Sequence, residues 1–122
     1  MTLATQAAAD FLKFDGLEAV TYVARRTDEQ GNPQETKIAI ANALRRAVGY
    51  RDRSLGVVSV DDVATTWHVR KQDIIDPVSE AVVTPQRGDT IIDGDGQKWG
   101  IRSFDLQTLS VRYRFVSVMG EM

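Results

Sequence analysis

The sequence lacks cysteine altogether and has one histidine, His68, among its 122 residues. Without cysteine the chain forms no disulfide and offers no thiolate to a metal. A single histidine would need carboxylates to complete an unusual zinc site. We therefore expect no metal site, and we interpret His68 as a strand residue that faces solvent or a subunit contact.

Long apolar runs are also missing. The chain has no stretch of about 18 apolar residues, which a membrane-spanning helix requires. Residues 1–15 have neither the basic start nor the apolar block of a secretory signal. These absences predict a soluble protein that is not exported and has no membrane partner.

Sequence motifs for catalysis are absent as well. The chain contains no G-x-S-x-G, P-loop or G-x-G-x-x-G pattern, so we expect neither an enzyme nor a cofactor. Asp93-Gly94-Asp95-Gly96 has the composition of a calcium loop, but the further spaced ligands and the closing glutamate of an EF-hand do not follow. A tight hairpin turn is the better interpretation.

The charges are nearly balanced, with 15 Lys and Arg against 17 Asp and Glu and a net charge of -2. Proteins dedicated to nucleic acids neutralise phosphates with a basic face. The balance therefore argues against such a protein, although it is compatible with a local basic patch.

The sequence is rich in short segments with β-strand character. A chain of 122 residues with 43% hydrophobic content can bury one core, which predicts a single domain over residues 1–122. Residues 18–26 place apolar side chains on one face, and residues 60–73 restore the same period of two. Residues 87–119 predict a three-stranded meander, with turns at 93–96 and 105–108. Five or six short strands predict a mainly all-β fold, a small antiparallel β-barrel.

Three segments interrupt this pattern. Residues 2–12, within an N-terminal arm of residues 1–15, have apolar side chains about four apart, which predicts a short helix that needs a surface to pack against. Residues 36–48 fit both a helix and a strand. Because a strand paired with residues 18–26 closes the sheet better, we favour a strand to about Arg45. Residues 74–86 contain two prolines and are expected to be a connection with at most a short edge strand.

The alternation of the strands also predicts the barrel interior. We expect its lining to include Trp67, Trp99, Ile101, Tyr113 and Phe115.

Residues 49–59 form a loop longer than a hairpin needs, and loops of this length are often functional. Two glycines make it pliable, and a tyrosine and a leucine are apolar groups that a purely solvated loop has little reason to carry. We expect this function in Gly49, Tyr50, Arg51, Asp52, Arg53, Ser54 and Leu55.

Arginines are spread through the predicted strands, where most are expected to lie on solvated faces beside carboxylates. In a ring assembly, arginines are favoured at subunit contacts because the guanidinium group binds carboxylates in a bidentate manner. The candidates for such contacts are Arg25, Arg26, Arg45, Arg46, Arg112 and Arg114.

The pattern P-x-R-G-D-T-I-x-D-x-x-G-x-x-W-x-I at residues 85–101, followed by R-Y-R-F-V at 112–116, resembles the head-closure (stopper) and head-tail joining proteins of long-tailed bacteriophages. The likeness covers residues 17–119. It includes the order of the parts: a β pair, a long loop, a strand with Trp67-His68-Val69, the Gly-Asp hairpin and a final basic and aromatic strand. The alanine-rich residues 1–14 have no match in it.

The resemblance implies a structural virion protein of the phage neck, assembled in the host cytoplasm. Such proteins are small β-barrels that form a homo-oligomeric ring, commonly of six, between the portal or adaptor and the tail terminator or tail tube. The ring retains packaged DNA without sequence specificity and provides the surface on which the tail docks. The long loop between the second and third strands reaches the channel in that family and can close it, and by position it corresponds to residues 49–59.

Two alternatives stay open. The first is a tail-completion (terminator) protein of the same neck region. The second is a small barrel that binds nucleic acid or another ligand, which should carry aromatic and basic side chains interleaved on one exposed face.

Overall fold

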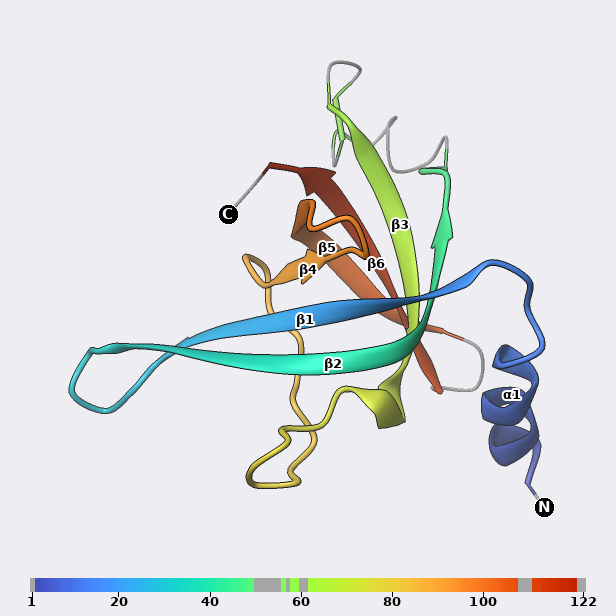
Figure 1. The fold of residues 1–122 in the computed structure, drawn as a ribbon, viewed down its shortest axis with the longest axis horizontal. Coiled ribbons are helices and arrows are strands. Elements are labelled where there is room, and N and C mark those ends of the chain that lie inside the picture. Colours follow the sequence, from blue (N-terminus) through green and yellow to red (C-terminus); the bar gives the residue numbers. More distant parts are fainter. Residues whose placement is uncertain (1, 50–55, 57, 60–61, 108–110, 121–122) are drawn as a thin grey trace.

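The structure is a computed structural model that describes residues 2–49, 56, 58–59, 62–107 and 111–120. Its elements, in chain order, are α1 (Leu3–Phe11), β1 (Leu17–Thr27), β2 (Pro33–Arg46), β3 (Ala64–Arg70), the 3₁₀ helix η1 (Lys71–Asp73), β4 (Thr90–Ile92), β5 (Lys98–Gln107) and β6 (Arg112–Met119). The six strands close into a barrel in the order β1-β2-β3-β6-β5-β4, and all neighbours are antiparallel (Figure 1). The predicted mainly β fold, a small antiparallel barrel with a short N-terminal helix, is confirmed.

The barrel interior is aromatic. Trp67 and Phe115 are fully buried and Trp99 is 4% exposed, and Ile101 and the partly buried Tyr113 pack in the same cluster. Trp67 and Trp99 meet edge to face with ring centroids 6.4 Å apart, a preferred aromatic geometry. All five residues predicted for the interior are therefore found there.

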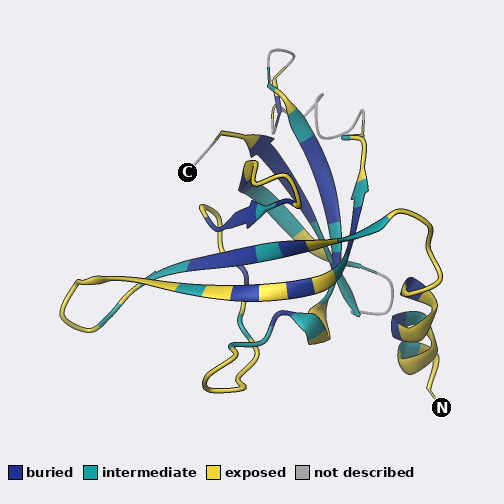
Figure 2. Cartoon of the chain, viewed as in Figure 1, coloured by how far each residue is buried: buried dark blue, intermediate teal, exposed yellow. Residues whose placement is uncertain are grey.

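β1 and β2 form a hairpin that is much longer than the barrel is deep. β1 pairs with β2 from Leu17 to Thr27, whereas its other edge pairs with β4 only at residues 21–23. β2 pairs with β3 only at residues 43–46. The far end of this hairpin therefore leaves the barrel as a two-stranded ribbon, which is half-buried at residues 25–26 and 36 and exposed from 29 to 35 (Figures 1 and 2).

β2 contains a β-bulge that decides which side chains enter the barrel. Val20 faces Ile40 and Glu18 faces Ala43, so β2 has one residue more than β1 in this interval. An extra residue reverses the alternation of faces beyond it. Ile38 and Ile40 therefore face inward, as does Ala43 after the bulge. The strand predicted for residues 36 to about 45 is confirmed, and the bulge within it has no counterpart in the sequence pattern.

Other boundaries also differ from the prediction. The turn expected at residues 105–108 is wrong in its first part, because β5 continues to Gln107 through pairs with β6. The strand expected at 60–73 begins at Ala64, leaving Val63 55% exposed, and passes into η1 after Arg70. The connection at 74–86 contains one isolated bridge, between Ile75 and Val82.

α1 begins at a threonine cap and packs through two buried residues, Ala8 and Phe11. The side-chain oxygen of Thr2 accepts a hydrogen bond from the Thr5 amide at 3.0 Å, a common helix start. Phe11 is 2% exposed, whereas Leu3 is 74% exposed. In the described part of the chain, no helix is long and apolar enough to cross a membrane.

Candidate subunit-contact surface

The Asp of the Arg-Gly-Asp motif lies inside the protein and holds the framework together. Asp89 is 1% exposed. Its two oxygens accept five hydrogen bonds: from the Tyr22 hydroxyl at 2.5 Å, the Arg25 amide at 3.1 Å, the Gln86 amide at 3.0 Å, and Arg26 Nη1 and Nη2 at 2.6 and 3.1 Å. Burial, and then the bond to Asp89, raise the pKa of Tyr22 well above its usual range, so the phenol stays a donor.

Asp93, the first residue of the next motif, D-x-x-G-x-x-W, is also a buried carboxylate that accepts several hydrogen bonds. Asp93 Oδ1 accepts from the Asp95 and Gln97 amides at 2.9 and 3.0 Å, which forms the predicted hairpin turn. Its Oδ2 accepts from Trp99 Nε1 at 3.0 Å and from Arg45 at 3.1 Å. Burial opposes ionisation, but these hydrogen bonds outweigh it and hold the pKa of Asp93 below its usual range. The motif residues that carry the family resemblance thus build the barrel.

Three of the six candidate arginines are engaged in the framework. Arg26 binds the buried Asp89, and Arg25 lies 3.6 Å from Glu35. Arg45 pairs with Glu18 at 2.8 Å as well as with Asp93, and its guanidinium lies 4.5 Å from the centre of the Trp67 ring. Arg45 therefore faces the aromatic core, where it also serves as a cation over an indole.

The other three candidates gather on the outside of the barrel around His68. Residues directly opposite in paired strands share a face. Thr66 lies opposite Arg46, His68 opposite Arg114, and Arg70 opposite Arg112. We call the side chains of Arg46, His68, Arg112 and Arg114 the basic face. It lies on the side of β3 opposite to Trp67.

The pKa of His68 reflects both its burial and the positive charge of the basic face. His68 is half-buried, rather than facing solvent as one reading of the sequence expected. Burial, followed by the positive charges of Arg112, Arg114 and Arg46, lowers its pKa to about 4. The imidazole is consequently neutral at pH 7, and the face carries its charge on the three arginines.

The arginines of the basic face are unequally satisfied. Arg114 donates to Asp105 at 3.1 Å. Arg112 lies over the rings of Phe11 and Phe14, 6.0 and 5.7 Å from their centres. Its Nε is buried and finds no hydrogen-bond partner in the described part of the chain, where Arg46 and Arg112 also form no salt bridge. Such a face suits carboxylates or phosphates, which guanidinium groups bind well.

The connection between β2 and β3 packs on the outside of the same strands. Val58 is 1% exposed and forms a second apolar cluster with Val116 and Val118, to which Val48 adds. Asp62 accepts from Arg102 at 2.8 Å and from the Ser59 amide at 2.8 Å. In this connection Gly49 is exposed, and residues 50–55, which include the predicted functional residues Tyr50 to Leu55, lie outside the described residues.

Sequence reasoning did not find the anchors of this connection or the role of Arg45. The anchors Val48, just before the predicted loop, and Val58, within it, look like ordinary apolar residues in the sequence, and the bulge that turns Arg45 inward has no local signal. The interpretation of Asp93-Gly94-Asp95-Gly96 as a turn is confirmed. Among the described residues, no group of three or more His, Asp or Glu side chains is placed to hold a metal ion.

Comparison with known proteins supports the fold. No family model matches the sequence, and no curated protein matches it. The solution structure of the protein SF1141 from Shigella flexneri 2a is similar, with a TM-score of 0.55, 11% sequence identity, and coverage of 84% of this chain and 91% of that chain. At this identity the likeness concerns the fold alone, so the class that the comparison and the topology define is a small six-stranded antiparallel barrel.

Proposed function

We propose that the protein is a ring-forming component of the neck of a long-tailed bacteriophage, a head-closure or head-tail joining protein without catalytic activity. The ring joins the portal or adaptor to the tail and closes the DNA channel. The observation that carries the proposal is the connection between β2 and β3, at the position where the resembling family has its channel loop.

The way this connection is held supports such a role. Val48 and Val58 pack in the cluster on the outer face, and Asp62 is tied to Arg102. These contacts hold the two ends of the connection against the barrel, and the segment between them is not needed to close the sheet. A loop with anchored ends can change in sequence or length without unfolding its domain, because loop closure costs little entropy.

The test is to replace residues 51–55 by two glycines. In the virus that carries the gene, the variant replaces the wild-type protein, and particles are examined by electron microscopy and by nuclease protection of their DNA. We expect the purified variant to melt as the wild type does, whereas particles lose DNA or fail to acquire tails.

A matched control changes an exposed loop at the other end of the barrel (Figure 1). Val78 is 91% exposed, and its neighbours to Glu80 are exposed as well, so these three residues are replaced by glycines. Control particles should keep both DNA and tails. If the shortened loop also gives filled, tailed particles at the normal rate, the channel-closing role is excluded. Particles that keep DNA but carry tails of irregular length would indicate the tail-completion role instead.

A further inference from the structure

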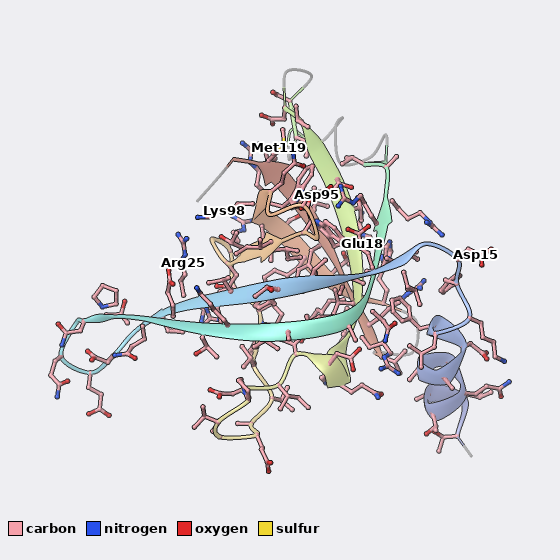
Figure 3. The ribbon with its side chains drawn as sticks, viewed as in Figure 1. Asp15, Glu18, Arg25, Asp95, Lys98 and Met119 are labelled. Atoms are coloured by element: carbon pink, nitrogen blue, oxygen red, sulfur yellow. The ribbon has the colours of Figure 1, made fainter. Side chains whose placement is uncertain are left out.

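The free end of the β1–β2 hairpin carries charge of one sign. Residues 27–36, which we call the acidic arm, contain Asp28, Glu29 and Glu35 and neither lysine nor arginine. Beyond Val23, the last residue paired with β4, β1 continues for four residues to Thr27, or about 13 Å of strand at about 3.3 Å per residue, so the arm lies at the far end of the ribbon. Arg25 and Arg26 lie in the stretch before the arm, where they pair with Glu35 and Asp89. Figure 3 shows Arg25 on this hairpin and Glu18 at the opposite end of β1.

The tip of the arm has a defined shape. The Asp28 carboxylate accepts from the Gln30 and Asn32 amides at 2.9 and 2.8 Å, and the Asp28 amide donates to the Asn32 carbonyl at 2.9 Å. Gly31, at φ 83°, takes the left-handed position that this turn requires. Glu29 is exposed at the tip and forms no ion pair in the described part of the chain. The turn thus fixes the backbone at Glu29 and leaves its carboxylate exposed to solvent.

A two-stranded ribbon alone in water is marginally stable, and its open edges invite pairing. Past Val23, the β1–β2 hairpin has no third strand in the described residues, and residues 29–35 are all exposed. A preformed, polar arm that no described residue of its own chain covers is suited to a contact with another molecule.

The basic face lies away from the acidic arm: it begins at Arg46, the last residue of β2, whose first residue, Pro33, belongs to the arm. The acidic arm and α1 lie at opposite ends of the longest axis (Figure 1). Arg112 of the basic face lies over Phe11 and Phe14, at the end of α1 and just beyond it. Opposite charges on separate surfaces of one molecule favour contacts between unlike surfaces, which generate rings when the rotation closes.

We propose that the acidic arm of one copy binds the basic face of the next, with Glu29 directed at Arg46. The contact is heterologous, so each subunit gives an arm and receives one. It rests on the proposed ring, since it specifies which surfaces of the neck protein meet. Two copies of this chain are sufficient for the contact, because both complementary surfaces belong to it.

Cysteine cross-linking tests the contact directly, because the chain has no cysteine of its own. The variant Glu29→Cys, Arg46→Cys is treated with a short bis-maleimide at high protein concentration and in assembled particles. Both sites are exposed, so the fold should tolerate them. We expect a ladder of covalent oligomers from the double variant and only traces of dimer from either single variant.

A charge exchange provides the second test. Glu29→Lys and Arg46→Glu should each weaken self-association by about tenfold, since each change replaces an attraction by a repulsion. An equimolar mixture of the two variants should assemble again, because each arm then meets a face of opposite charge. The controls are Lys98→Glu and Glu80→Lys, at exposed positions outside both surfaces, which should associate as the wild type does.

The outcomes separate this contact from the proposed function. A ladder of covalent oligomers that stops at one fixed number of subunits supports both the contact and the closed ring. A ladder that continues into open chains supports the contact and removes the closed ring. Strong dimers from Glu29→Cys alone or from Arg46→Cys alone would show symmetric pairing and overturn the proposed contact. The absence of cross-links both in solution and in particles would also overturn it. In either case the loop experiment would still decide the neck function.

Discussion

The largest loss of stability is expected from substitution of Asp89, the buried carboxylate that accepts five hydrogen bonds. In Asp89→Asn the volume is kept, but the negative charge is lost and one oxygen becomes an NH2 group. That group faces donors from Tyr22, Arg26 or the Gln86 amide. Removing one partner of a buried ion pair costs about 3 to 5 kcal/mol, because the remaining charge and donors stay desolvated.

The expected loss is large for a domain of this size. With an unfolding entropy of about 2.1 cal/mol/K per residue, 122 residues give about 0.26 kcal/mol/K, so the melting temperature should fall by about 12 to 20 °C. Such a loss is a large share of the total of about 5 to 15 kcal/mol that holds most domains together. The measurement is urea unfolding followed by tryptophan fluorescence, with thermal melting by circular dichroism as a second observable.

Two variants give this prediction its control and its means of refutation. Asp95→Asn changes an exposed carboxylate in the β4–β5 turn and should stay within about 0.5 kcal/mol of the wild type. Tyr22→Phe removes one of the five bonds and should cost about 1 to 2 kcal/mol. In the double variant with Asp89→Asn the costs should be less than additive, because both residues share one hydrogen bond. If Asp89→Asn melts as Asp95→Asn does, the network does not hold the barrel together.

Three further predictions follow from the core and the arginines. Trp99→Ala should cost about 3 to 5 kcal/mol in urea unfolding, since the ring is 4% exposed, and an unchanged midpoint would contradict the assignment of the barrel interior. His68 has a folded pKa of about 4 against an ordinary 6.5, so the unfolded chain takes up the proton first and stability present above pH 6.5 should be lost as the pH falls towards 4. This loss of stability should reach about 2 kcal/mol after allowance for the partial exposure of His68, and the variant His68→Gln should not show it. If the stability of His68→Gln falls with pH as steeply as that of the wild type, the loss is due to other groups. Arg45→Glu should lower the stability by about 3 kcal/mol because it breaks the pair with the buried Asp93, whereas Arg46→Glu should leave melting within about 0.5 kcal/mol of the wild type. Equal melting of the two variants would refute the inward placement of Arg45.

The sequence by itself determined the kind of structure and much of its core. Short apolar segments of period two, separated by turns with Asp and Gly at set positions, allow few arrangements other than a small antiparallel barrel. The same alternation placed Trp67, Trp99 and Phe115 inside. These are local properties, since the turn residues and the strand period act over a few positions and do not require knowledge of distant partners.

The sequence also named the six arginines as a set, but only the tertiary structure separated them. One extra residue in β2 relative to β1 reverses the faces, so Arg45 turns towards Trp67 and Arg46 turns towards solvent beside His68. The bulge depends on pairing between strands and has no signature in the neighbouring residues. Asp89 likewise reads as part of a turn until it meets Tyr22, which is 67 positions away in the chain. Which arginines remain for a partner is therefore decided by register and by buried carboxylates from distant segments, and these arise only when the barrel closes.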